Sequence, residues 1–327
     1  MAVSARTRKC QLGDEGTGTP TWGTATAATA IWLGTVTMQD LTNVTHIEES
    51  IGNYLGYGRT YIPSEGAEIN FDSVPASYEQ LGYPLYAGID GEAGTSSSGT
   101  LYLWTYIMSD TAAQNLRSYT LEVGDSEDVE EASYCLCRSF NLSGSVDEAV
   151  MLSSTWFGRS VTGGVSFTAG LTRASTEPLI FNTGKLYIDS NTAGTSQVSN
   201  SFRSFSLDVT TGAQPIQTAD GNLYFTFYKI VDPEVILTIT AEHTSDWDSA
   251  GEKANWRNET DRIIRVQFNG SSGRRLHTDL FGKWTSFSSI EESDGNSVLT
   301  GTFKAHYSAS AALGCKFVLA NTLATMP

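Results

Sequence analysis

The sequence has little histidine, cysteine, proline or positive charge, and each shortage narrows what the chain can be. Its 327 residues include 4 His, 4 Cys and 8 Pro, with 20 Lys or Arg against 36 Asp or Glu. The net charge of −16 repels nucleic-acid phosphates and anionic membranes, which excludes a conventional DNA- or RNA-binding protein. No apolar run reaches the roughly 18 residues that a membrane-spanning helix needs.

Two further absences concern the cellular compartment. The opening residues, MAVSARTRKCQLGDEG, carry basic side chains but lack the apolar core of a secretory signal. Cys135 and Cys137 lie two apart in a strand-like segment and share a face, and neither they nor Cys10 and Cys315 show zinc-ligand spacing. We therefore expect a soluble protein made in a reducing cytoplasm, whose cysteines pack as small apolar groups.

Motifs of catalysis are lacking as well. The four histidines are scattered, and no nucleophile elbow, zinc-protease, Walker or dinucleotide-binding pattern occurs. Asp246, Asp248 and Glu252 beside Trp247 allow a glycosidase interpretation, but spacing along a polar loop does not fix the separation that two catalytic carboxylates need. A solvated loop is the simpler interpretation. We expect no enzyme, and no catalytic, cofactor-binding or metal site.

What the chain does contain is typical of β-structure. Ser, Thr and Gly are abundant, and aromatic residues make up 11%. In AEINFDSVPASYEQLGYPLYA, residues 67–87, Ala67, Ile69 and Phe71 alternate with polar residues, which predicts a half-buried strand. Pro75 ends the pairing, and Ser77 with Gln80 has capping-box spacing before a short helix. Such a unit indicates a β-sandwich with a helix across one sheet end, or an α+β domain with a helical crossover.

The rest of the chain is read as strands separated by polar turns. Residues 1–28 are small and polar, and we interpret them as a flexible arm that orders only against a neighbour. A weakly patterned stretch at 162–176 separates a first β domain (29–170) from a second one (171–327). Arg138-Ser139-Phe140-Asn141-Leu142 is echoed by Arg203-Ser204-Phe205-Ser206-Leu207, which is consistent with a duplication. The predicted fold class is mainly β, with two tandem sandwich or barrel domains, each carrying at most a short flanking helix.

Two segments are candidates for binding. The loop IGNYLGYGRTYIPSEG, residues 51–66, carries Tyr54, Tyr57, Arg59 and Tyr61, and interfaces are enriched in Tyr and Arg. Alternatively, these tyrosines cover the edge of the domain's own core. The acidic run GDSEDVEEAS, residues 124–133, is ordinarily a solvated loop. Negative charge serves solubility, but it would also let a pore pass DNA without holding it.

The order of parts resembles the major tail tube proteins of long-tailed, siphophage-type bacteriophages. Paired strands (IWLGTVTMQDLTNVTHIEES) precede the long loop of residues 51–66. The strand–helix unit AEINFDSVPASYEQLGYPLYAGI follows, and further strands end in STWFGRSVTGG. The second half, from TGKLYIDSNTAGTS to KFVLANT, resembles a divergent second copy that lacks a clear counterpart of the YEQL helix. The resemblance covers most of the chain, and no single motif in it is diagnostic.

This resemblance implies a structural virion protein whose sheets join side by side into rings, which stack into the hollow conduit for DNA ejection. Two tube domains in one chain imply a trimeric ring that imitates a hexamer, although a hexamer remains open. The loop with Tyr54, Tyr57, Arg59 and Tyr61 would contact the next ring. Tape measure and tail terminator proteins would be partners, DNA would pass without specific binding, no membrane is involved, and the location would be the virion tail, assembled in the host cytoplasm.

Within this interpretation the acidic run supplies candidates for the lining of the lumen, namely Glu127, Asp128, Glu130 and Glu131. Other functions stay open. The chain could be a virion-surface or secreted β-sandwich that binds glycans through Trp247, Trp256 or the tyrosines of residues 51–66. It could also be another virion structural protein, such as a head–tail connector or a capsid decoration protein.

Overall fold

The strand–helix unit forms as its sequence predicts. β6 (Ala67–Pro75) buries Ala67, Ile69 and Phe71 and turns its polar residues outward. Behind it, Ser77 Oγ accepts a hydrogen bond from the Gln80 backbone N–H at 3.2 Å. α1 (Gly82–Gly88) then begins and is buried along its whole length. The capping-box residue therefore organises the turn that leads into the helix.

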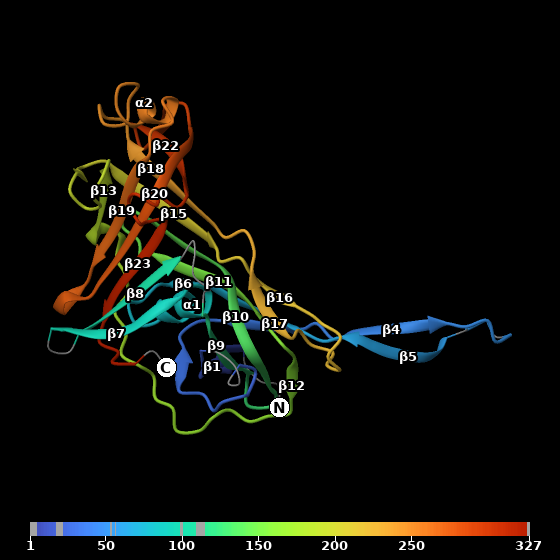
Figure 1. Ribbon diagram of the computed structural model, residues 1–327. Helices are drawn as coiled ribbons and strands as arrows, with labels where there is room; N and C mark the ends of the chain where they lie inside the picture. The colour runs from blue at the N-terminus through green and yellow to red at the C-terminus, as the bar shows by residue number, and fades with distance from the viewer. Residues whose placement is uncertain are drawn as a thin grey trace.

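The computed structural model describes residues 5–17, 22–52, 54–55, 57–98, 101–108 and 115–325, and it is mainly β (Figure 1). The elements of the first half are η1 (Ala5–Thr7), β1 (Lys9–Thr17), β2 (Ala30–Trp32), β3 (Val36–Asp40), β4 (Asn43–Glu48), β5 (Tyr57–Ser64), β6, α1, β7 (Gly91–Ser98), β8 (Leu101–Met108), β9 (Arg117–Gly124), β10 (Val129–Ser145), β11 (Met151–Gly158) and β12 (Val161–Gly163).

The second half continues in the same style. Its elements are η2 (Phe181–Thr183), β13 (Gly184–Asp189), β14 (Gln197–Val198), β15 (Phe202–Thr210), β16 (Ala213–Ile216), β17 (Phe227–Ile230), β18 (Glu234–Glu242), α2 (Glu252–Arg257), β19 (Arg262–Asn269), η3 (Ser271–Gly273), β20 (Arg275–Phe287), β21 (Glu291–Ser293), β22 (Asn296–Ala305) and β23 (Cys315–Asn321). The segment interpreted as a polar loop, 243–260, thus contains a helix.

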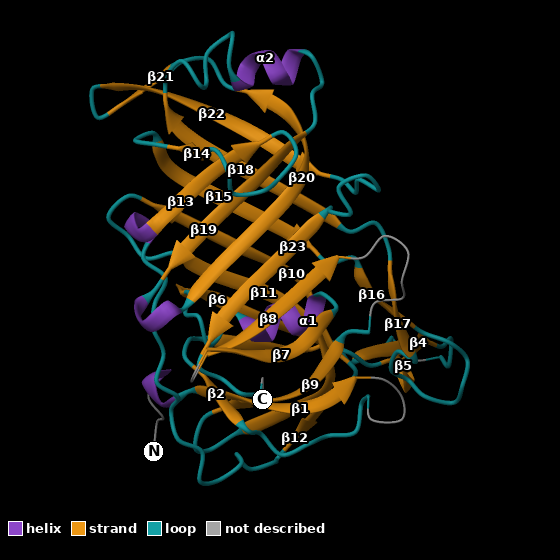
Figure 2. Cartoon of the chain, turned by 60° about the vertical axis from the view of Figure 1, so that its left-hand side comes forward, coloured by secondary structure: helices purple, strands orange, loops and turns teal. Residues whose placement is uncertain are grey.

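The strands form two crossing layers (Figure 2). One layer has the order β3-β6-β11-β10-β15-β18-β22, and the other runs β14-β13-β19-β20-β23-β8-β7. The end of β20 crosses from the second layer to pair with β22 of the first. A third sheet, β2-β1-β9 with the beginning of β10 and β12, closes the end nearest the N-terminus.

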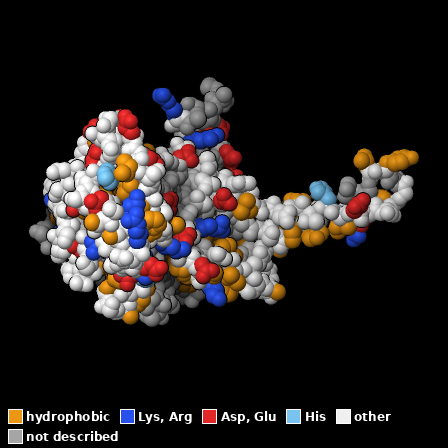
Figure 3. All heavy atoms as spheres, turned by 90° about the horizontal axis from the view of Figure 1, so that it is seen from above, with side chains coloured by type: hydrophobic (Ala, Val, Ile, Leu, Met, Phe, Trp, Pro, Cys, Tyr) orange, Lys and Arg blue, Asp and Glu red, His pale blue; other side chains and the backbone are white. Residues whose placement is uncertain are grey.

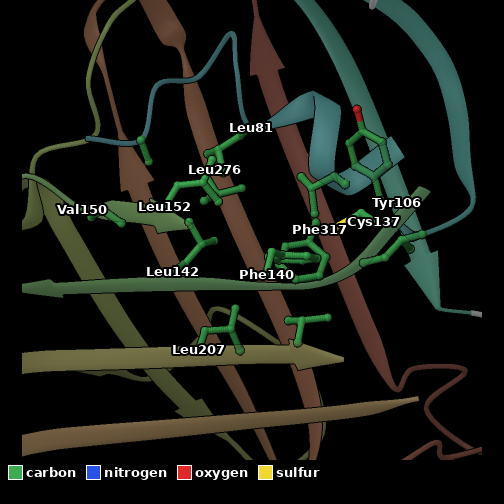
Figure 4. Packing of buried hydrophobic residues seen from close by; sticks show 14 of the residues in the cluster. Leu81, Tyr106, Cys137, Phe140, Leu142, Val150, Leu152, Leu207, Leu276 and Phe317 are labelled. Carbon is green, nitrogen blue, oxygen red and sulfur yellow. The ribbon is translucent and has the colours of Figure 1, made fainter. Parts of the chain in front are cut away.

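The hydrophobic core lies between these layers (Figure 4). Phe140 of β10 packs against Phe317 of β23 with ring centroids 5.9 Å apart, and Leu142, Leu207 and Leu276 belong to the same cluster. This cluster contains buried residues from both halves of the chain. The core therefore does not divide at 170/171, where the sequence analysis placed a domain boundary.

The order of neighbouring strands is nevertheless the same in the two halves of the chain. In the first half β2, β1, β9, β10, β11, β6 and β3 are neighbours in that order, and β12 lies on the far side of β10. In the second half β14, β13, β19, β20, β22, β18 and β15 follow the same order, with β23 beside β20. A hairpin precedes β6 and β18, and a short helix follows each of them. β7, β8 and β21 have no counterpart.

The five-residue echo noticed in the sequence is not part of this repeat. Its two copies lie in β10 and β15, which pair directly with each other, with Leu142 opposite Leu207. By strand order, however, β10 corresponds to β20 and β15 corresponds to β3. The echo therefore reflects two adjacent strands of similar alternation and does not mark equivalent positions.

The beginning of the chain is also more ordered than a flexible arm would be. β1 buries Cys10 and Leu12 and pairs with β9 along most of its length. Glu15 at its end is buried as well, and its carboxylate accepts hydrogen bonds from Ser118 Oγ and Thr120 Oγ1, both at 2.7 Å. It also accepts from the Tyr134 N–H at 2.9 Å, where β10 bends from one sheet into another. The expectation of a flexible arm is therefore wrong for residues 9–17.

Candidate assembly surfaces

The two halves of the chain meet edge to edge in one sheet. Ser139–Ser145 of β10 pairs with Ser204–Thr210 of β15, with Phe140 opposite Val209. The Thr211 N–H donates to the Arg138 carbonyl at 3.0 Å, which fixes the start of this seam. Seven residue pairs join the halves in this way. The β10–β15 seam therefore continues the sheet of one half into the other.

The counterparts of these two strands form the outer ends of the same layer. β3, the counterpart of β15, pairs with β6 on one side, and no strand lies on its other side among the described residues. At the opposite end, Lys283–Phe287 of β20, the counterpart of the seam part of β10, pairs with β22 and extends beyond the end of β19. One backbone acceptor there is already used, since the Trp256 indole donates to the Thr285 carbonyl at 3.1 Å.

In each half a hairpin follows directly after one of the two corresponding strands, β3 or β15, and the two hairpins differ in their surroundings. β16–β17 packs against the first half: Arg159 donates to the carbonyls of Phe225 and Thr226 at 3.1 and 2.7 Å. The Arg159 guanidinium also stacks on Tyr134, 4.4 Å from the ring centroid, and the Leu116 N–H donates to Tyr228 Oη at 3.1 Å. By contrast, β4–β5 projects away from the body (Figures 1 and 3).

Apolar side chains are exposed along this projecting hairpin, which we call the arm (residues 41–64). At its far end Tyr54 is fully exposed, Leu55 is 86% exposed and Ile51 is 56% exposed. Near its base the exposed apolar residues are Leu41, Val44, Tyr61 and Ile62. A two-stranded hairpin is only marginally stable by itself in water, and contiguous exposed apolar side chains mark interaction sites.

The residues predicted for inter-ring contact all lie on this arm. Tyr54 is at the tip, while Arg59 and Tyr61 are exposed on β5, where Tyr61 pairs with Thr45. Arg59 Nε donates to Glu49 Oε1 across the hairpin at 2.6 Å. Tyr57 begins β5, and its side chain lies outside the described part of the structure. The segment called a loop thus contains the second strand of a β-hairpin, paired with β4.

The residues predicted for the lumen lie elsewhere, at the β9–β10 turn of the third sheet. Glu127 and Asp128 are exposed, and their backbone N–H groups donate to Asp125 Oδ1. Glu130 and Glu131 are half-buried on β10. Burial raises the pKa of Glu131, and the carboxylates of Glu122 and Glu15 raise it further.

Burial also raises the pKa of Glu130, to which Asp128 and Asp40 add. The acidic run therefore places like charges close together at the end of the molecule that holds β1 and β9. It does not lie on the seven-stranded layer that contains the seam.

The outer face of the seam layer has a different chemistry that the sequence analysis did not single out. Asn141 Nδ2 donates to Asp208 Oδ1 across the seam at 2.7 Å. Around this pair the outward residues of neighbouring strands are small and polar, including Thr37, Asn70, Ser139, Ser153, Thr155, Ser206, Thr210, Thr238, Thr300 and Thr302. The alternation was visible in the sequence, but only strand order shows that these residues form one continuous surface.

The tryptophans proposed for glycan binding do not form an open platform. Trp247 is fully buried and packs against Trp284 at 5.8 Å. Trp256 is half-buried and is hydrogen-bonded to β20. A sugar cannot stack on the buried Trp247, so that residue is excluded as a binding platform.

The acidic residues considered for glycoside hydrolysis have structural partners. Glu252 is buried, accepts from Arg262 Nη2 at 2.7 Å and from Trp284 Nε1 at 2.8 Å. Asp248 Oδ1 accepts from the backbone N–H groups of Ala250 and Gly251 as α2 approaches. These contacts stabilise the loop that carries α2 and account for both carboxylates.

All four cysteines are buried free thiols, and burial raises the pKa of each one. No group of three or more potential metal-ligating side chains is present in the described ranges. Within the same part of the chain, no helix is long and apolar enough to cross a membrane. Neither a protein-family model nor a curated protein matches the sequence.

Proposed function

We propose that the chain is a structural subunit that joins copies of itself edge to edge into closed rings, which stack into a hollow tail tube for DNA ejection. The observation that carries this proposal is the β10–β15 seam within a repeated strand order. The same junction can form between copies, because β3 corresponds to β15 and the end of β20 corresponds to β10. Edge strands that pair between chains are satisfied and no longer promote irregular association.

The register of the proposed junction follows from the seam inside the chain. We align Phe140 of β10 with Trp284 of β20. The paired residues across each half then match Val36 with Leu207, and therefore Met38 with Val209. Trp284 of one copy would therefore lie opposite Met38 of the next. A repeated head-to-tail junction forms a ring if the rotation closes, and stacking of rings leaves growth open along one axis. With two repeats in each chain, we favour three copies in the ring.

The polar face of the seam layer is the surface that we assign to the lumen. Its hydroxyl and amide groups, with carboxylates such as Asp208, offer few cations to DNA phosphates, so DNA would slide without being held. Glu127, Asp128, Glu130 and Glu131 lie on a different sheet, and a role for them in the lining stays a prediction. The tip of the arm, with Tyr54 and Leu55, is the surface proposed for contact with the next ring.

Direct imaging tests the proposal. Negative-stain electron microscopy of the purified chain at high concentration should show rings or tubes with a central channel. Sedimentation of the same sample should give discrete assemblies rather than one protomer. Tape measure and tail terminator proteins would set the length of such tubes in a virion. A monomer that remains dispersed at all concentrations would refute the proposed function.

A further inference from the structure

The arm and the groove beside β22 offer a second contact between neighbouring copies. In the first half, a groove lies between the start of β6 and the end of β11. Its lining includes Phe157 and Gly158, Leu41 and Ser64 at the base of the arm, and Phe225 of the β16–β17 hairpin. Phe225 packs on Phe157 with ring centroids 5.5 Å apart. One wall of this groove is therefore formed by the other half of the same chain.

The second half has the corresponding groove, between the start of β18 and the end of β22. It has a volume of about 160 Å³ and is lined by Pro233, Val235, Ala305, His306 and Tyr307, together with Met108 and Cys315 from the neighbouring strands. Tyr307 is 41% exposed. The hairpin that corresponds to β16–β17 is the arm, and in a single chain the arm projects away from the body (Figure 1).

We infer that the base of the arm in one copy docks into the Pro233–His306–Tyr307 groove of the next copy in the same ring. The inference rests on the proposed function, because the copies must first be neighbours through β3 and β20. The link between strand and hairpin has the same length in the two halves, since β4 starts three residues after the end of β3, as β16 starts three residues after the end of β15.

The chemistry of the two surfaces is complementary. The base of the arm exposes Val44, Tyr61 and Ile62, which a single chain leaves in water. By strand pairing Tyr61 corresponds to Tyr228, because Thr45 and Pro215, each the third residue of its strand, lie opposite them; the Tyr228 hydroxyl group holds the β16–β17 hairpin to the first half. On the groove side the His306 ring lies perpendicular to the Phe281 ring, with ring centroids 5.2 Å apart. Its Nε2 lies 3.4 Å from Asp261 Oδ1, and the His306 side chain is 44% exposed.

This assignment gives the arm two separate roles. Its base would lock neighbours within one ring, and its tip would remain for contact between rings. Tyr61 then belongs to the lateral contact and Tyr54 to the contact along the tube. Burying the base would also stabilise a hairpin that is otherwise solvated on both faces.

Cysteine cross-linking tests the docking. In the double variant Ile62→Cys, His306→Cys, mild oxidation should link copies into a covalent ladder on a non-reducing gel, whose largest species gives the number of copies in a ring. The four native cysteines are buried, so unmodified protein should give no ladder. The matched control, Tyr54→Cys with His306→Cys, should form rings without this ladder.

A charged side chain introduced at the base of the arm provides a second test of the docking. Ile62→Asp should raise the concentration needed for ring formation about tenfold or more, whereas Leu55→Ser at the tip should leave rings intact and shorten tubes. Both sites are exposed in the protomer, so the thermal unfolding of the protomer should not change. Normal ring formation by Ile62→Asp, together with rings of the Ile62→Cys, His306→Cys variant that give no ladder on oxidation, would overturn the docking while the proposed function stands. Wild-type protein without any rings would overturn both.

Discussion

The direction of single backbone groups in β3 allows a sharp test of the edge-to-edge junction. The Leu41 N–H donates to the Gly66 carbonyl, and the Asp72 N–H donates to the Thr35 carbonyl. Odd-numbered residues of β3 therefore direct their backbone groups toward β6, and because the direction alternates along a strand, Met38 directs its N–H toward the unpaired edge. Met38→Pro should remove a donor from that edge and leave the hydrogen bonds to β6 in place.

The size of the effect follows from the seam inside the chain. There the Thr211 N–H donates to the Arg138 carbonyl, so by the same alternation Phe140 and Val209 exchange two backbone hydrogen bonds. Met38 corresponds to Val209 and should make the same pair with Trp284 of the next copy. A proline loses one of these bonds and places its ring where the neighbouring backbone approaches. We expect a loss of about 1–3 kcal/mol per junction, or roughly 5- to 150-fold in the association constant.

Two further variants separate assembly from folding. Met38→Leu keeps the volume of the side chain and the N–H, and should assemble like the wild type. Gln39→Pro removes a donor that faces β6, so it should lower the unfolding temperature of the protomer itself. Sedimentation velocity over a concentration series reports the junction, and thermal unfolding monitored by circular dichroism reports the protomer.

The two proline variants remove donors from opposite edges of β3. Met38→Pro loses the packing of the Met38 side chain on the core but keeps the hydrogen bonds to β6, so it should lower the unfolding temperature less than Gln39→Pro does and should form few rings. Rings that form equally well with Met38→Pro would show that β3 is not the joining edge. Equal destabilisation of the protomer by both prolines would show that the assigned directions of the backbone groups are wrong.

Two more predictions concern the protomer. Arg159→Ala removes two hydrogen bonds and the stacking on Tyr134, so the free energy of unfolding in urea should fall by about 2–4 kcal/mol. If the hairpin detaches locally, amide exchange should become faster in β16–β17 alone. Unchanged amide exchange would contradict the role of Arg159 as the anchor of the hairpin. The pKa of Glu131 is raised in the folded state. Its contribution to the free energy of unfolding is therefore fully present below the unfolded pKa of about 4.3 and is lost as the pH rises through the folded pKa. Glu131→Gln should therefore be more stable than the wild type at pH 7, with the difference shrinking below about pH 4 in calorimetry; a difference that does not depend on pH would refute the assignment.

Local patterns predicted much of the first half. Alternation of Ala67, Ile69 and Phe71 gave one face of a strand, and the spacing of Ser77 and Gln80 gave the turn before a short helix. These predictions held because each depends on neighbours within a few residues. The buried carboxylate of Glu15 had no such signal, since its partners Ser118, Thr120 and Tyr134 are about a hundred residues away in the sequence.

In residues 51–66, local composition predicted the interaction surface but did not predict the strand. The tyrosines and Arg59 of this loop indicated an interaction surface, and the structure places them on an exposed hairpin. The strand β5 was not predicted within this loop, because pairing with β4 stabilises a conformation that composition alone does not favour. In α2, likewise, Glu252 is held by Arg262 and Trp284, contacts that no window of sequence contains.

The sequence by itself determined the β character of the chain, the positions of most strands and the shortage of cations, because alternation and composition act locally. Only the tertiary structure decided which strands are neighbours. Strand order made β10 and β15 an internal seam and left their counterparts, the end of β20 and β3, each paired on one side only within the described part of the chain. Any two strands of suitable alternation can pair, so the choice among them is made by the packing of the whole core and not by the strands themselves.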